Sequence, residues 1–327
     1  WRINWQAPFD GQGSSLPYAL FPFQGEAPPP NQNASIDVPP AACIQQANFR
    51  LVIRCAKDLW PQVEAAVWAW ANVGGLGSRT RRGCGAVFCK DFAPENKDGF
   101  KRMWSQYMPE LFAEREWPTL VTAILFGNEK PDAIAAWDQV IGLLRQFRQG
   151  VGLGRNPGQR ADRPGRSRWP EPDTIRRITQ RSKATHKPDD QKPKGFPRAE
   201  CGLPIVFHFK DEHSGDPPQT ILYPENDRDG NRRERMASPL ILKPLALADG
   251  KALPLILRLK TPDLAGVDLR KKVQGQEQSL PLPEPTLIRG PRLLKNSDSP
   301  LARLGKGSAL EAFLAYASTE GFTEVTR

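Results

Sequence analysis

The twelve residues 74–85 read GGLGSRTRRGCG and hold five glycines and three arginines. Glycine has no Cβ, so it adopts positive φ easily and lets a backbone come close to a ligand. A guanidinium is a planar donor of several hydrogen bonds and suits phosphate. Since the stretch contains no acid, it predicts a phosphate-binding loop, called the glycine-rich loop below. Its expected contact residues are Gly74, Gly75, Gly77, Ser78, Arg79, Arg81 and Arg82.

This loop does not follow the common nucleotide-binding patterns. No Gly-Lys-Ser/Thr follows its glycines, so it is not a nucleotide P-loop. A dinucleotide fingerprint would need glycine where Thr80 stands, and it would follow a strand and open a helix. The alternative to phosphate binding is a solvated turn in which the arginines lie by chance.

The segments on both sides of the loop predict the elements that position it. Residues 49–55, FRLVIRC, alternate apolar and basic side chains, which is typical of a half-buried strand. Arg50 and Arg54 then share one face, and we include both among the expected contacts to the phosphate-bearing partner. Residues 86–89, AVFC, predict a second strand.

A helix is expected between the first strand and the loop. Pro61 suits the first turn of a helix. Val63, Val67 and Trp70 recur at helical spacing and predict its buried stripe. Asn72 and the first glycines end it. The local order is therefore strand, helix, glycine-rich loop, strand.

The basic charge of the chain lies in one region. The chain carries 46 lysines and arginines against 36 acids, and residues 145–198 account for the whole excess, with 15 bases against 5 acids. Such a region indicates a polyanionic partner, and a solvated basic linker is the alternative. We expect few apolar residues, a short helix at 173–182, a solvated linker at 183–194 and ordering on assembly with RNA. The expected contacts to RNA or a protein partner here are Arg163, Arg166, Arg168 and Trp169, whose indole would stack on a base or dock into a neighbouring subunit.

The remainder of the chain predicts further strands and helices. Residues 98–150 are expected to be helical, with Ile134, Trp137, Ile141 and Leu144 as one buried stripe. Strands are expected at 203–210, 238–247 and 253–260, with Asp249-Gly250 as a tight hairpin turn between the last two. Leucines of the third strand would face the core and its bases would face away.

Two local signals follow in the C-terminal part. Ser308 and Glu311 predict a capping box at the start of a helix. Residues 229–235 repeat the chemistry of the glycine-rich loop. The expected RNA contacts in this second loop are Arg232, Arg233 and Arg235.

No catalytic set is evident in the sequence. Histidine is the commonest acid–base group at neutral pH, but the chain has only His186, His208 and His213, each expected to be structural or solvated. Known hydrolase and metal-binding motifs are absent. Cys84 and Cys89 would lie on opposite faces of one strand and are expected to be buried thiols rather than metal ligands. We predict no catalytic residue, no metal and no cofactor.

The cysteines and hydropathy also bear on location. An odd number of cysteines, five, in a long chain without a secretory leader suggests reduced thiols. No apolar run approaches the roughly 20 residues that cross a membrane. A cytoplasmic protein without membrane partners is expected.

Several separate motifs, taken in order, resemble a known family. Strand, helix, glycine-rich loop and strand resemble the second half of a ferredoxin-like RAMP domain, the fold of CRISPR RNA-binding proteins. The other motifs resemble the family of RAMP subunits numbered first in the type III-B Cmr effector complex. They are LPYALFPFQG at 16–25, PGRSRWPE at 164–171, FPR at 196–198, GLPIVFHF at 202–209 and MASPLIL at 236–242.

The resemblance implies an α+β fold with two ferredoxin-like (RRM-like) domains and a helical, basic insertion between them. The expected boundaries are 1–97 for the remainder of the N-terminal RAMP domain, 98–198 for the insertion and 199–327 for the C-terminal RAMP domain. One departure concerns the opening strand and Thr-Pro/Gly-Gly segment of the family, which the chain lacks. The first N-terminal half-domain is therefore expected to be missing from this sequence or supplied elsewhere.

The function implied by the resemblance is non-catalytic RNA binding in antiviral defence. Such a subunit would cap the filament at the 3′ end of the guide RNA (crRNA). Its expected partners are guide and target RNA and the neighbouring backbone and small Cmr subunits. The alternatives are a RAMP endoribonuclease that processes guide RNA and a general RNA-binding module.

Overall fold

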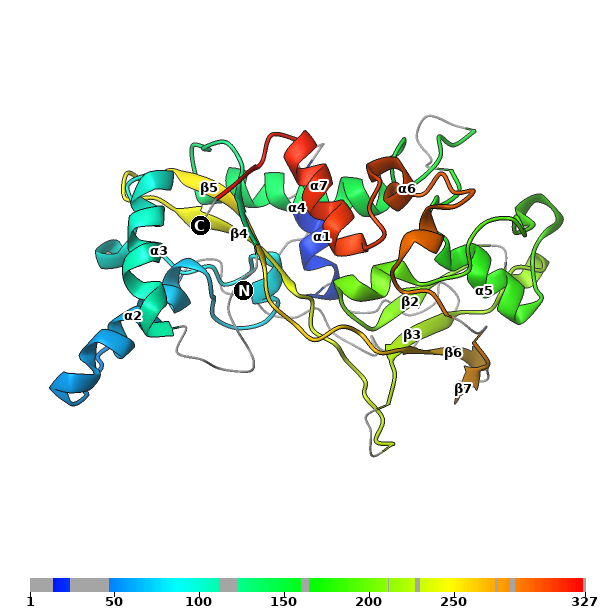
Figure 1. The fold of residues 1–327 in the computed structure, drawn as a ribbon, viewed down its shortest axis with the longest axis horizontal. Coiled ribbons are helices and arrows are strands. Elements are labelled where there is room, and N and C mark those ends of the chain that lie inside the picture. The colour runs from blue at the N-terminus through cyan, green and yellow to red at the C-terminus, as the bar shows by residue number, and fades with distance from the viewer. Residues whose placement is uncertain are drawn as a thin grey trace, which may run out of the picture. The chain divides into compact units, whose positions relative to one another are not determined.

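The computed structural model describes residues 14–23, 47–111, 123–159, 165–210, 212–226, 230–273, 276–282 and 286–325. The chain divides into two compact units. The first unit comprises 1–145, 241–257 and 323–327, and the second comprises 146–240 and 258–322. This division differs from the predicted boundaries at 97 and 198, because a hairpin and the last strand join the N-terminal part. The fold is α+β, and Figure 1 shows its elements.

The first unit contains helices and one described sheet. The sheet has four strands in the order β4-β5-β1-β8, with β1 and β8 antiparallel. The elements are α1 (Leu16–Leu20), α2 (Trp60–Asn72), α3 (Lys97–Leu111), β1 (Ala123–Phe126), most of α4 (Ala133–Gln149), β4 (Leu240–Ala246), β5 (Ala252–Arg258) and β8 (Thr323–Glu324).

The hairpin of β4 and β5 confirms its turn signal. Gly250 has φ of 88°, and Leu247 N donates to Lys251 O across the turn at 2.8 Å. The expectation for the strand at 253–260 is confirmed for Leu253, Leu255 and Leu257, which are buried, and Ile256 on the other face of β5 is buried as well. A strand covered on both faces reads as a continuous apolar run rather than as an alternation.

Helices α2 and α3 pack together through aromatic rings. The ring of Trp68 lies 5.8 Å from that of Phe100, and Phe100 also meets Phe126 of β1 edge-on at 5.2 Å. Pro61 lies in the first turn of α2, as expected. The predicted stripe is wrong in detail, because Ala65 and Trp68 form the most buried face while Val63, Val67 and Trp70 are less buried.

Several predicted elements are absent from the described residues. Residues 49–55 and 86–89 are not strands, and 49–55 is exposed throughout. Alternation alone does not make a strand, since a strand also needs a neighbour for its backbone groups. The expected helical region 98–150 is interrupted by β1. In α4, Ile134 is exposed, unlike the other three members of its expected stripe.

The second unit has its own described sheet, β2-β3-β6-β7, in which all neighbours are antiparallel. Ile205 and Phe207 of β2 are buried and Val206 is exposed, which confirms the predicted alternation. Ile175 of α5 packs into the same apolar cluster. The elements are α5 (Glu171–Thr179), β2 (Ile205–Phe207), β3 (Thr220–Pro224), β6 (Val267–Val273), β7 (Gln276–Leu280), α6 (Pro300–Leu304) and α7 (Ala309–Thr319).

Helix α7 begins where the sequence indicates, but with an additional partner. Ser308 Oγ accepts a hydrogen bond from Glu311 N. The buried Glu200 carboxylate accepts bonds from Ser308 Oγ at 2.8 Å and from Ala309 N at 2.7 Å. A carboxylate at a helix N-terminus satisfies backbone donors and complements the helix dipole.

Three further observations concern the described residues as a whole. None of their helices is long and apolar enough to cross a membrane. They contain no group of three His, Cys, Asp or Glu side chains that could hold a metal ion. Cys84 and Cys89 are half-buried, not buried, and they do not lie on opposite faces of a strand, because residues 86–89 are not a strand. The ferredoxin-like assignment stays a prediction.

Candidate nucleic-acid interface

The glycine-rich loop leaves α2 and closes on itself. Gly74 N donates to Ala69 O at 3.0 Å, and Leu76 N donates to Gly85 O at 2.8 Å. Gly85 has φ of 66°, and a Cβ there would lie 1.7 Å from Leu76 O. Glycine at 85 is therefore required for the closure, by both conformation and space.

Two residues from distant parts of the chain hold the backbone of the loop. Trp137 Nε1 of α4 donates to Arg82 O at 2.6 Å. Lys243 Nζ of β4 donates to Gly74 O at 2.8 Å and to Ala71 O at 3.3 Å. The lysine thereby satisfies carbonyl groups at the C-terminal end of α2, which have no partner within the helix.

Lys243 is 1% exposed, and burial lowers the pKa of its ammonium to about 7. This residue was not among those predicted from the sequence. Its signal was a single lysine in the apolar strand LILKPLA, but the sequence does not show which carbonyl groups it meets.

Arg79 is the least neutralised cation of the loop. It has φ of 57°, in the left-handed region. Its Nε is buried without a hydrogen-bond partner in the described part of the chain. Burial lowers the pKa of its guanidinium, and no described carboxylate forms an ion pair with it. A buried donor of this kind gains most from an anion that supplies the missing acceptor.

The loop carries two further arginines, Arg81 and Arg82, and exposed backbone next to Arg79 in the sequence. Burial also lowers the pKa of Arg81, and Arg82 Nη1 donates to Arg81 O at 3.0 Å. Gly77 and Ser78 are exposed, and the space above Gly77 is open to 4 Å. Exposed backbone beside partly desolvated guanidinium groups is suited to a phosphate.

The segment 49–55 begins beside this loop. The rings of Phe49 and Trp70 lie 6.1 Å apart, and Trp70 Nε1 donates to Gly75 O at 3.2 Å. Arg50 and Arg54 are exposed on this segment, but they do not lie on the predicted strand.

The basic segment contradicts its predicted role. Trp169 is 1% exposed, and its Nε1 donates to Arg148 O at 3.0 Å. A buried indole cannot stack on a base. Ile175 and Phe196 are also buried, so residues on both sides of the expected linker contribute to a core, whereas residues 183–194 of the linker are exposed or half-buried. Arg163 lies outside the described residues.

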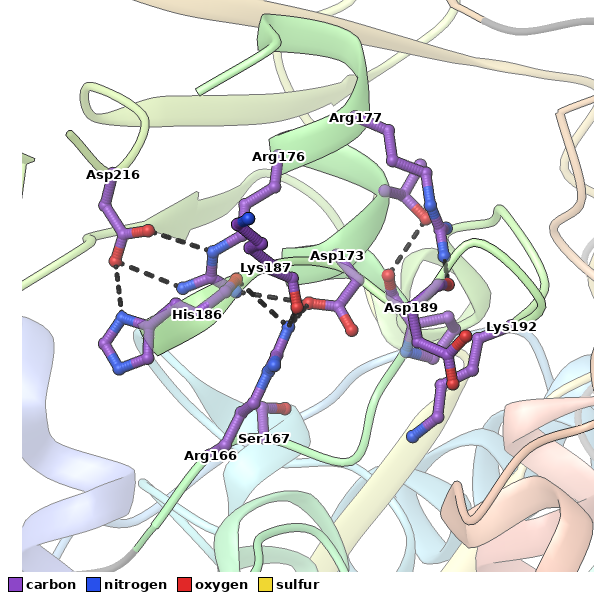
Figure 2. A network of polar contacts seen from close by, with 12 residues as sticks. Arg166, Ser167, Asp173, Arg176, Arg177, His186, Lys187, Asp189, Lys192 and Asp216 are labelled. Carbon is purple, nitrogen blue, oxygen red and sulfur yellow. Dashed lines mark hydrogen bonds and ion pairs between the residues drawn. The ribbon is translucent and has the colours of Figure 1, made fainter. Parts of the chain in front are cut away.

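The arginines of this segment meet acidic side chains, as Figure 2 shows. Arg166 pairs with Asp173. Arg176 Nε lies 3.0 Å from Asp216 Oδ1 and its Nη1 lies 3.2 Å from Asp173 Oδ1. His186 Nδ1 lies 3.1 Å from Asp216 Oδ2. These ion pairs and hydrogen bonds form one network of charged side chains in the second unit.

Asp216 is the centre of that network and is 2% exposed. Burial acts to raise the pKa of its carboxyl, but hydrogen bonds with Arg176, His186 and Lys183 N hold it at about 2. His186 is half-buried and Asp216 orients its ring, which agrees with the expectation of a structural histidine. No local signal joins the two residues.

Arg168 is also engaged within the second unit. Its Nε donates to Asn156 Oδ1 at 2.6 Å and its Nη1 donates to Gly152 O at 3.0 Å. The Asp298 carboxylate lies 3.9 Å from Nε. Arg166 and Arg168 therefore make internal polar contacts where contacts to RNA were expected.

In the second arginine loop, one of the three expected contact residues, Arg232, is held by internal contacts. Arg232 lies 2.5 Å from Glu277 and its guanidinium lies 5.3 Å above the ring of Tyr223. Arg233 and Arg235 are exposed.

The structure thus brings Gly74–Arg82 together as one site and assigns Arg166, Arg168 and Trp169 to internal contacts. In comparisons with protein-family models, curated proteins and solved structures, nothing matches this chain.

Proposed function

We propose that the chain binds RNA backbone through the glycine-rich loop, as a non-catalytic subunit of a type III-B CRISPR Cmr effector complex. The observation that carries RNA binding is Arg79, a partly buried guanidinium whose Nε has no acceptor among the described residues. Its neighbours Gly77 and Ser78 offer exposed backbone beside it. The motifs that resemble the Cmr family carry the assignment to that complex.

Phosphate recognition fits the requirement of such a subunit. Contacts to phosphate position a nucleic acid but carry no sequence information. A guide-binding protein must accept any guide sequence, and base pairing between guide and target supplies discrimination in RNA-guided systems. In this proposal the subunit caps the filament at the 3′ end of the guide and contacts its backbone and small-subunit neighbours.

The test replaces the charges of the loop and keeps part of their aliphatic stems. The variant Arg79→Gln with Arg81→Gln should bind two unrelated single-stranded RNAs more weakly, by the same factor for both. The slope of log affinity against log salt should flatten by about 0.7 for each phosphate that the variant no longer neutralises. Arg102→Gln, on α3, removes one charge outside the loop, from a residue that pairs with Glu95 at 3.4 Å, and is the control for general surface charge.

Two results would contradict this role of the loop. One is an unchanged affinity and salt slope in the double variant. The other is an equal reduction in the Arg102→Gln control, which would indicate general surface charge rather than a site.

A second candidate function is a guide-processing endoribonuclease. It is favoured by one observation, the Asp216 carboxylate that lies 3.1 Å from His186 Nδ1, because such a carboxylate orients an imidazole for proton transfer. We expect no specific cleavage when the purified chain is incubated with repeat RNA without metal. Specific cleavage that is abolished in His186→Ala would replace the binding proposal with this one.

A further inference from the structure

A cavity lies in the second unit, at the C-terminal end of α5. It has a volume of about 520 Å³, within the range of ligand pockets. It is lined by Ile178, Thr179, Arg181, Glu212, Pro218, Lys271, Lys272 and Leu280.

One side of this cavity is apolar and has firm support. Ile178 and Leu280 are half-buried and pack against the apolar core of the second unit. Side chains that rest on a close-packed core keep their positions. They therefore offer a preformed surface for a flat, weakly polar group.

Arg181 is placed at the cavity by the end of α5. Gln180 has φ of 53°, and Arg181 N donates to Arg176 O at 3.2 Å, which turns the chain out of the helix. The Arg181 side chain donates from Nη2 to Glu212 O at 3.1 Å. This bond fixes the guanidinium but leaves most of its five donors available.

Lys271, on β6, contributes a second cation to the lining of this cavity. It pairs with Thr220 on β3 and with Gln278 on β7. Alternate residues of a strand share a face. Lys271 therefore lies on the same face of β6 as Val267 and Leu269, which belong to the apolar core of the second unit. Neither Lys271 nor Lys272 forms an ion pair with any residue that the structure describes. The four charged residues in the lining, three basic and Glu212, leave an excess of two positive charges.

The neighbouring cavity of the same unit shows the contrast. It has about 260 Å³ and is lined by Arg166, Arg168 and Lys192 together with Asp173, Asp189 and Asp298. Three acids there balance three bases, and Arg166, Arg168 and Lys192 each lie within ion-pair distance of an acid. The cavity at the end of α5 has no such balance.

We propose that the cavity at the end of α5 binds a nucleotide, with its phosphate at Lys271 and Arg181 and its base against Ile178 and Leu280. The ligand is either a free mononucleotide or one nucleotide of an RNA strand, because both present the same phosphate and base. This site lies outside the glycine-rich loop and does not depend on it.

The first experiment uses the full chain and measures binding of adenosine monophosphate, adenosine and inorganic phosphate by calorimetry. We expect the monophosphate to bind at least about tenfold more tightly than adenosine, since a hydrogen bond to a charged group is worth that factor or more. Inorganic phosphate should bind more weakly than the monophosphate because it lacks the base. Equal binding of monophosphate and adenosine would overturn the proposal.

The second experiment compares three variants. Lys271→Met keeps the aliphatic stem and should weaken binding of the monophosphate about tenfold, while Lys271→Arg should restore most of it. Lys306→Met, on an exposed lysine of the same unit, should have no effect. Circular dichroism checks that each variant is folded. Unchanged binding of the monophosphate to a folded Lys271→Met variant would contradict the proposed site.

The third experiment distinguishes the two sources of the nucleotide. It measures binding of a short single-stranded RNA in the Arg79→Gln, Arg81→Gln background, with and without Lys271→Met. A further decrease in affinity on adding Lys271→Met assigns an RNA nucleotide to the cavity, and no further decrease assigns the free mononucleotide. Binding of neither ligand to the unmodified cavity would overturn this inference and leave the loop proposal to its own test.

Discussion

The glycine-rich loop and the segment 165–198 are both rich in arginine, but they use it differently. Arg79 of the loop has a buried Nε without a partner in the described part of the chain. Arg166 and Arg176 of the segment form ion pairs with Asp173 and Asp216. The structure describes no acidic partner for Arg79, whereas the arginines of the segment have acids nearby. Arg177 and Arg198 also keep a buried Nε without a hydrogen-bond partner among the described residues, but each lies within ion-pair distance of an acid.

The difference shows that a local excess of basic residues does not measure available charge. Within 145–198 the bases outnumber the acids three to one. Two of the acids that neutralise this segment, Asp216 and Asp298, come from elsewhere in the sequence. In the folded chain, internal acids therefore neutralise much of the positive charge that suggested an RNA contact.

The largest expected effect is on the stability of the second unit. Asp216→Ala removes the partner of Arg176, which is 7% exposed, and leaves a buried guanidinium with one partner fewer. Removing one member of a buried ion pair typically costs about 3–5 kcal/mol. Chemical denaturation should show a decrease of this size in the free energy of unfolding. A decrease below about 1 kcal/mol would mean that the network contributes no more than a surface pair.

The pH dependence of this network sharpens the same comparison. The pKa of Asp216 in the folded chain is about 2, below its ordinary 3.8, so its contribution is present above pH 4 and disappears as the pH falls toward 2. The shift corresponds to about 2 kcal/mol. Asp216→Asn should lack this dependence, which thermal melting between pH 2 and 5 measures. Parallel curves for both proteins would contradict it.

Two glycine substitutions test the loop at matched positions. Gly85→Ala places a Cβ against Leu76 O, whereas the space at Gly77 is open and φ is 88°. Gly85→Ala should open the loop and lower RNA affinity to the level of the arginine double variant. Gly77→Ala should cost only about 1 kcal/mol of stability from its positive φ, with RNA binding kept. Equal RNA binding by the two variants would show that loop closure is irrelevant.

Limited proteolysis compares the segments directly. Trypsin should spare Arg166 and Arg168 in the free folded chain, because both are held by hydrogen bonds within the second unit. It should cut after Arg50 or Arg54, which lie in an exposed segment outside regular structure. Early cleavage after Arg168 would restore the expectation of a segment that orders only on assembly.

A last pH effect concerns Lys243, which holds the backbone of the loop. Its pKa in the folded chain is about 7 against an ordinary 10.5, so the unfolded chain binds more protons between these values. Stability should therefore rise as the pH increases from 7 to 9. Lys243→Met should show a flatter dependence, which melting curves at pH 7, 8 and 9 compare. The same slope in both proteins would mean that the lysine does not titrate in this range.

The amino-acid sequence determined the features that depend on near neighbours. Pro61 marked the start of α2, Asp249-Gly250 marked a hairpin, Ser308 marked the start of α7, and the alternation around Val206 marked β2. Each follows from the conformational preference or capping chemistry of a few adjacent residues. The glycine-rich loop was likewise recognised from its composition.

Only the tertiary structure decided what those elements meet. The alternation at 49–55 equals that of a strand, but no described strand pairs with it. Asp216 lies 40 residues from Arg176, and Lys243 lies 169 residues from the carbonyl that it binds in the loop. Strand pairing, charge neutralisation and burial depend on neighbours in space, and local sequence preferences do not encode which distant residues these are.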